Sequence, residues 1–150
     1  MKRTLSLLLL LGLLLCACGG GTKETPYSTD QAEAILTSGA FEGSDMAPLE
    51  LSVAAMLYGV DASTLTDGVC YLAANTSVSA DELAILIFRD EAAAQAGAEA
   101  LQKRVQSQIA VCESYAPAAV PRLEQAVIRQ RGATVLYAVG DPEVLGGLEQ

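Results

Sequence analysis

The chain of 150 residues contains no histidine, and this absence limits the chemistry that its side chains could perform. Histidine is the usual general base near neutral pH and completes most serine and cysteine nucleophile pairs. Two carboxylates can still hydrolyse a glycosidic bond without it. On position alone, the candidates for catalysis are Glu82, at the mouth of an expected strand, and Tyr115, at the end of an expected helix.

Both candidates also have a purely structural interpretation. The chain carries 18 acidic residues, so pairs of carboxylates arise by chance. Glu82 is then a solvated residue at the start of a strand, and Tyr115 is a half-buried aromatic whose hydroxyl bonds a nearby carbonyl. We therefore assign no catalytic residue and expect no cofactor.

A loop at residues 61–68 places oxygen donors at Asp61, Ser63 and Asp67, which invites a calcium interpretation. An EF-hand loop needs donors at its first, third and fifth positions, glycine at the sixth and a terminal glutamate. Leu65 stands at the fifth position and Thr66 at the sixth. The loop is therefore predicted to be a capped turn, and no metal ligand is assigned.

The N-terminus has the layout of a secretory signal. Lys2 and Arg3 precede an apolar run at residues 5–15, which only Ser6 and Gly12 interrupt. As a helix this run would rise about 16 Å, roughly half the hydrocarbon thickness of a bilayer. It is too short for a transmembrane anchor and fits the apolar region of a signal peptide.

The four residues that follow, Leu15, Cys16, Ala17 and Cys18, resemble a bacterial lipobox. This resemblance implies cleavage between Ala17 and Cys18 and acylation of Cys18, with chains such as palmitate, on the outer face of the cell membrane. The alternative is an ordinary signal, cleaved near Ala17 or Gly19, which would give a secreted protein. The glycines at 19–21 favour the lipoprotein, because a flexible spacer lets a domain stand off the membrane.

Three parts are expected: a signal peptide at 1–17, the lipidated cysteine and a tether at 18–28, and one domain at 29–150. About 120 residues can bury a core of their own. The net charge of −9 becomes about −11 once Lys2 and Arg3 are removed. Such a charge excludes nucleic-acid binding and adhesion to anionic head groups, so the lipid would provide the contact with the membrane.

The pattern of apolar residues predicts an α+β domain with the element order α-α-β-β-α-α-β-β-α. Two hairpins form a four-stranded antiparallel sheet, with the helices packed mainly on one face. In the second helix, Leu49, Val53, Met56 and Leu57 form the expected inner stripe. The helices are expected at 31–36, 47–58, 91–113, 118–126 and from 142 onward, and the strands at 69–74, 83–88, 127–131 and 133–139.

The same layout separates the two cysteines of the domain, Cys70 and Cys112. The long helix starts beside Cys70 and runs back roughly 30 Å, which places Cys112 at the far end of the sheet. A disulfide needs Cα atoms within about 7 Å of each other. Two free thiols are expected, with a disulfide as the alternative that an extracytoplasmic site permits.

Several short motifs occur in an order and spacing that resemble a known family. With the lipobox, they are similar to a family of small bacterial lipoproteins catalogued as domain of unknown function 4358, over residues 29–141. The chain departs from the family pattern after Ile87, where Phe88-Arg89 replaces an expected lysine. The family brings no established activity, so no catalytic residue is carried over. The motifs are Tyr58-Gly59-Val60-Asp61, Asp81-Glu82-Leu83-Ala84-Ile85, Tyr115-Ala116-Pro117, and Gly132 before the strand of residues 135–139.

Three functions remain open. The first is a non-catalytic binding or scaffold module at the cell envelope, which acts through an envelope protein or a cell-wall partner. The second is a small solute-binding accessory lipoprotein of a transporter, although the domain is short for two lobes and poor in aromatic residues. The third is a hydrolase that uses carboxylates. Apolar area on the sheet face away from the helices would favour the first, a co-purifying ligand the second, and turnover lost on Glu82→Gln the third.

Overall fold

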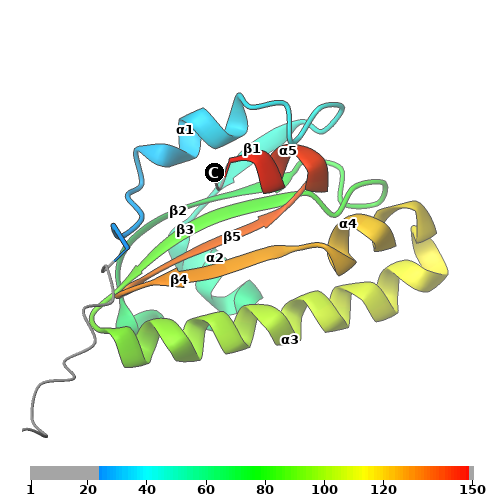
Figure 1. The fold of residues 1–150 in the computed structure, drawn as a ribbon. Helices are drawn as coiled ribbons and strands as arrows, with labels where there is room; N and C mark the ends of the chain where they lie inside the picture. Colours follow the sequence, from blue (N-terminus) through cyan, green and yellow to red (C-terminus); the bar gives the residue numbers. More distant parts are fainter. Residues whose placement is uncertain (1–23, 149–150) are drawn as a thin grey trace, which may run out of the picture.

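The computed structural model describes residues 24–148, so the expected signal peptide, Cys18 and the start of the tether lie outside the described residues. The described part folds into one antiparallel sheet with helices against it (Figure 1). Its elements in chain order are α1 (Gln31–Leu36), β1 (Met46–Leu49), α2 (Leu51–Tyr58), the short 3-10 turn η1 (Ala62–Thr64), β2 (Leu65–Ala73), β3 (Glu82–Phe88), α3 (Glu91–Tyr115), the 3-10 turn η2 (Pro117–Ala119), α4 (Val120–Glu124), β4 (Val127–Arg131), β5 (Thr134–Val139) and α5 (Pro142–Gly147).

The sheet has the strand order β1-β2-β3-β5-β4, and every neighbouring pair is antiparallel. The two predicted hairpins, β2–β3 and β4–β5, are confirmed. Gly132 turns the second hairpin with a φ of 57°, a left-handed backbone that favours glycine. β3 and β5 pair with each other at the centre, where Glu82 lies opposite Val139.

The prediction of four strands is wrong, because β1 adds a fifth at the edge beside β2. The segment that begins with Ala47 was expected to be the start of a helix with Pro48 in its first turn. Instead Pro48 lies opposite Tyr71 in the sheet, and α2 begins only at Leu51. Proline is tolerated in an edge strand, where its missing N–H need not serve a second neighbour. β1 also covers an edge of β2 that would otherwise be left unpaired.

The prediction for the inner face of α2 is wrong as well. Val53, Met56 and Leu57 are 44%, 80% and 41% exposed, whereas Ala54 and Tyr58 are buried. The small side chain of Ala54 lets the helix lie close to the sheet, and the Tyr58 ring fills the space beside it. The residues of α2 that are buried are therefore those that fit closely against the sheet, and not those with the largest apolar side chains.

The helices lie mainly on one face of the sheet, as expected, but two short helices cover the other face as well. In Figure 1, α1 and α5 lie above the sheet, and α2, α3 and α4 lie below it. Each central strand divides its side chains between two cores by simple alternation, as predicted for β5. Ala84, Leu86, Phe88, Val135, Tyr137 and Val139 belong to the core with α2, α3 and α4, and Leu83, Ile85, Leu136 and Ala138 belong to the core with α1 and α5.

The long helix α3 forms as predicted. Asp90 caps it by accepting a hydrogen bond from the backbone N–H of Ala93 at 2.8 Å. Ala94, Leu101 and Val105 form a stripe on it that is buried against the sheet. No helix among residues 24–148 has both the length and the apolar character needed to cross a bilayer.

Both cysteines of the domain are free thiols. Cys70 is buried on β2, opposite Ala84, and Cys112 is half-buried near the end of α3. The expectation of two free thiols is confirmed. Burial raises the pKa of Cys70 to about 12, with a further contribution from the nearby charge of Glu82.

We expect Gly97→Ala to destabilise the protein, because a Cβ at this position would lie 2.2 Å from Cζ of Phe88. Overpacking of this kind costs about 1–3 kcal/mol, which exceeds the gain of up to about 1 kcal/mol from replacing glycine in a helix. Urea denaturation measures the difference. Gly146→Ala in α5 is the matched control, since no atom lies within 4 Å of its added Cβ, and it should not destabilise. Equal stability of the two variants would contradict the packing of α3 on β3.

Candidate functional site

Two consecutive acidic residues, Asp81 and Glu82, enter the first central strand, and both are fully buried at 0% exposure. The structural expectation that Glu82 is solvated is therefore wrong. A buried carboxylate is costly unless a cation and hydrogen bonds compensate its charge. Each of the two carboxylates forms an ion pair with a different arginine.

Glu82 forms a two-point ion pair with Arg104 of α3. Its Oε1 accepts from Nη2 at 2.5 Å and its Oε2 accepts from Nε at 3.1 Å. The Arg104 side chain is only 11% exposed, and its Nη1 also donates to the carbonyl of Leu57 at 3.2 Å. Since the fork engages both carboxylate oxygens, the pair joins β3 to α3 and to the end of α2.

Two tyrosine rings complete this buried cluster. Tyr58 and Tyr137 pack edge to face with ring centroids 5.6 Å apart, and the guanidinium of Arg104 lies 5.3 Å from the centroid of Tyr58. Burial, and then the charge of Glu82, raise the pKa of both tyrosines well above the usual value. Neither hydroxyl makes a hydrogen bond of good geometry to another described residue, although Glu82 is near enough to influence both. Both phenols therefore stay protonated at neutral pH.

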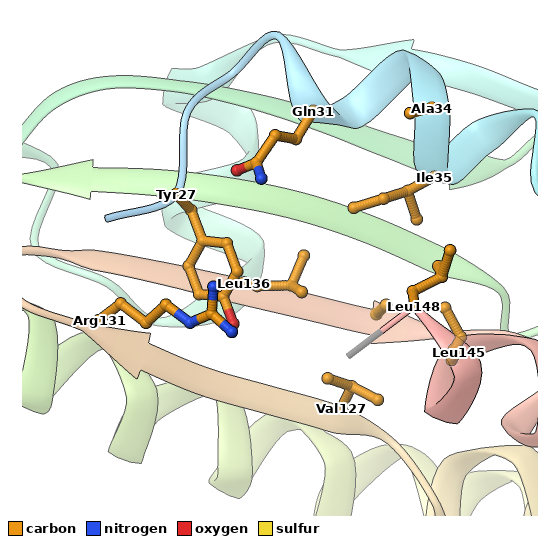
Figure 2. A pocket seen from close by; sticks show the side chains of 10 residues that line it. Tyr27, Gln31, Ala34, Ile35, Val127, Arg131, Leu136, Leu145 and Leu148 are labelled. Atoms are coloured by element: carbon orange, nitrogen blue, oxygen red, sulfur yellow. The ribbon is translucent and has the colours of Figure 1, made fainter. Parts of the chain in front are cut away.

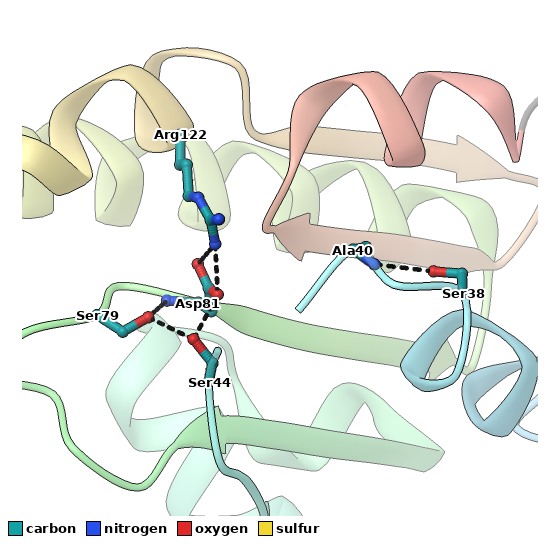
Figure 3. Close-up of polar contacts among 6 residues, drawn as sticks. All are labelled: Ser38, Ala40, Ser44, Ser79, Asp81 and Arg122. Atoms are coloured by element: carbon teal, nitrogen blue, oxygen red, sulfur yellow. Dashed lines mark hydrogen bonds and ion pairs between the residues drawn. The ribbon is translucent and has the colours of Figure 1, made fainter. Parts of the chain in front are cut away.

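Asp81 lies in a second polar cluster, shown in Figure 3. Nη1 of Arg122 in α4 donates to Oδ1 at 2.9 Å and to Oδ2 at 2.7 Å. The hydroxyl of Ser44 donates to Oδ2 at 2.6 Å, and the backbone N–H of Asp81 donates to the Ser79 hydroxyl at 3.1 Å. The cluster ties the loop before β1, the turn before β3, and α4 together.

The structure does not bring the two sequence candidates for catalysis together. Tyr115 is 84% exposed rather than half-buried. It follows Arg104, the partner of Glu82, by eleven residues, which is about 16 Å along the axis of α3. Glu82 itself has no exposed surface, and both of its carboxylate oxygens accept hydrogen bonds from Arg104. A general acid or base must reach its substrate. Glu82 is buried and Tyr115 lies far from it, so the two residues cannot act on one substrate at the same site.

The predicted capped turn is confirmed for residues 61–64, but the rest of the expected loop is not a loop, because β2 already begins at Leu65. Oδ1 of Asp61 accepts from the backbone N–H and the hydroxyl of Ser63 at 2.9 and 2.7 Å, and these bonds lower the pKa of Asp61. Asp67 accepts from the N–H of Gly68 at 2.8 Å. Between residues 24 and 148, no three histidine, cysteine, aspartate or glutamate side chains gather into a group that could hold a metal.

A pocket of about 220 Å³ lies on the other face of the sheet, below α1 and beside α5 (Figure 2). Most of its lining is aliphatic, and one end carries polar side chains. The sequence does not predict this pocket, because it does not show how α1 and α5 would lie over this face. The lining residues are Tyr27, Gln31, Ala34, Ile35, Val127, Arg131, Leu136, Ala138, Leu145 and Leu148.

The polar end of the pocket is built around Arg131. Its guanidinium lies 4.5 Å from the centroid of the Tyr27 ring, and its Nε is 3.2 Å from a carboxylate oxygen of Glu24. The backbone N–H of Tyr27 donates to the Thr134 hydroxyl at 2.9 Å, which fixes the incoming chain against β5. At the other end, Leu148 lines the pocket while remaining 47% exposed.

We expect Arg104→Gln to lower the free energy of unfolding by about 3–5 kcal/mol, because it leaves the buried charge of Glu82 without a cation. Urea denaturation followed by circular dichroism checks this. Arg89→Gln is the matched control, since Arg89 pairs with Asp90 at 3.3 Å with both side chains more than half exposed. Such a surface pair contributes about 0–1 kcal/mol. The double variant Glu82→Gln/Arg104→Gln should recover part of the loss, and a loss no larger than that of Arg89→Gln would contradict the pairing.

Comparison with known proteins places the domain in a family. No curated protein and no solved structure matches the chain. The match that is found has no known function attached to it, so it supports the resemblance seen in the motifs and no activity. Residues 40–140, more than half of the chain, match the family described as domain of unknown function (DUF4358), and the chain therefore belongs to that family.

Proposed function

We propose that the protein is a lipid-anchored binding module on the outer face of the cell membrane, and that it acts without catalysis. The observation that carries the binding function is the apolar pocket between α1, α5 and the sheet. The anchor rests on the lipobox of residues 15–18, with acylation of Cys18 after cleavage behind Ala17.

The pocket exists because its cover is short. α1 and α5 contain six residues each, and they share the sheet face that is opposite to the 25 residues of α3. Ile35 is half-buried and Leu148 is largely exposed, although both line the pocket. Apolar surface that a chain leaves open in a concave site is typical of binding sites. Because the proposed anchor holds the protein on the outer face of the membrane, the expected partner is an envelope molecule rather than nucleic acid.

A small-solute accessory protein of a transporter is the second candidate. Ligand pockets usually have volumes of about 300–1,000 Å³, whereas an apolar cavity of about 150 Å³ already binds benzene. The pocket of about 220 Å³ lies between these values and suits a small ligand. A hydrolase is supported less well, because its candidate carboxylate, Glu82, is buried and paired.

The anchor predicts a defined mass for the native protein. Extracted from the membrane fraction, it should begin at Cys18 and carry acyl groups, and alkylation after unfolding should modify Cys70 and Cys112. A Cys18→Ser variant should lack the acyl mass and leave the membrane fraction or stay unprocessed. An unacylated wild-type chain in the medium would contradict the anchor.

The binding function predicts a partner at the pocket rather than elsewhere on the domain. A photo-crosslinking amino acid at Ala34, which lines the pocket from the exposed side of α1, should trap an envelope molecule in intact cells. The matched control places the same group at Ala110, an exposed position on α3. Equal patterns of crosslinked products from both positions would contradict a binding role for the pocket.

A further inference from the structure

We propose that the pocket binds a medium-chain fatty acid, with the alkyl chain along the sheet and the carboxylate at Arg131. The inference rests on the proposed binding function and names the class of ligand for that site. Three features support it: the shape of the pocket, the charge at one end, and the short stretch of sequence between that end and Cys18.

The shape suits an unbranched chain. Arg131 and Val127 lie on the same face of β4 and are four residues apart, which is about 13 Å along a strand. Both line the pocket, so it extends along the strand rather than into the core. Leu136 and Ala138 of β5 form the floor, and Ile35 of α1 lies above it in Figure 2. A mainly aliphatic pocket that extends along a strand favours an alkyl chain over a compact polar solute.

The charged end suits a carboxylate. The ion pair between Glu24 and Arg131 runs through Nε at 3.2 Å, and the Glu24 side chain is 70% exposed, so water screens this contact. Among residues 24–148, no hydrogen bond engages the two terminal nitrogens of Arg131. A guanidinium in this state can make two parallel bonds to an incoming carboxylate.

The source of the ligand follows from the tether. Glu24 is the sixth residue after Cys18, and a chain of six residues spans at most about 20 Å. Glu24 contacts Arg131, so acylation of Cys18 would hold the charged end of the pocket close to the membrane surface. A single-chain amphiphile dissolved in the membrane is therefore the ligand nearest to this opening, with its carboxylate at the level of the head groups.

The test uses the mature chain of residues 18–150 with Cys18→Ser, which has no acyl chain of its own to compete for the pocket. Its sheet and both described cores come from residues 24–148, so the fold is retained. Sodium decanoate is titrated calorimetrically, below the concentration at which it aggregates. We expect saturable binding at one site, and at least tenfold weaker binding of nonyltrimethylammonium, which has the same alkyl chain and the opposite charge.

Two sets of variants locate the site. Arg131→Gln should weaken decanoate binding at least tenfold and abolish the preference for the anion, whereas Arg131→Lys should retain part of it. Ala34→Phe should fill the pocket and prevent binding, whereas Ala110→Phe on α3 should leave it unchanged. Thermal unfolding confirms that each variant is folded. In the methyl NMR spectrum, decanoate should shift Ile35 and Leu145 and leave Val105, in the other core, in place.

Absence of saturable binding would overturn the inference, as would equal affinity for the two amphiphiles or equal binding by the two phenylalanine variants. These failures are distinct from failure of the proposed function. If decanoate does not bind while Ala34 still traps an envelope partner, the binding module stands and the ligand class is wrong. If Ala34 traps nothing and decanoate does not bind, both are wrong.

Discussion

The fold depends on a central strand that is apolar on both faces. β3 presents Leu83 and Ile85 to one side and Leu86 and Phe88 to the other, and all four are buried. Such a strand is stable only when both faces are covered. α3 closes one face along 25 residues, whereas α1 and α5 share the other with six residues each. The unequal cover leaves a closed core on one side and an open pocket on the other.

The acidic pair at the entrance of β3 shows how the closed side is fixed. Two buried carboxylates would destabilise the sheet, but Arg104 of α3 and Arg122 of α4 compensate them separately. A buried ion pair adds little net stability compared with apolar residues, yet the loss of one partner is costly. The pairs therefore select one placement of α3 and α4 on the sheet. The same ion pairs engage both oxygens of each carboxylate within the fold.

The sequence predicts the long, periodic elements and fails where tertiary partners decide. α3, β3, β5 and both hairpins follow from apolar spacing and from Gly132, and they are found as expected. β1 was missed because Pro48 favours the first turn of a helix as well as an edge strand, and only the free edge of β2 decides between them. Glu82 was misjudged because its partner lies 22 residues away on another element. The pocket could not be predicted, because its existence depends on how little of one face α1 and α5 cover. One signal was present in the sequence: Val127, Arg129 and Arg131 alternate along β4, which indicates an edge that is both apolar and basic.

Charged residues on β4 have a simpler explanation, which the geometry tests. Edge strands often carry charges that prevent pairing with another sheet, and β4 is an edge. Gln130 fits this explanation, since its side chain turns to the other face and donates to the carbonyls of Glu91 and Gly132. Arg131 does not fit it: its side chain is only 28% exposed and lies over the Tyr27 ring at the end of an aliphatic pocket. Protection of an edge requires a solvated charge, whereas recognition of an amphiphile requires a cation next to apolar surface, and Arg131 has the second arrangement.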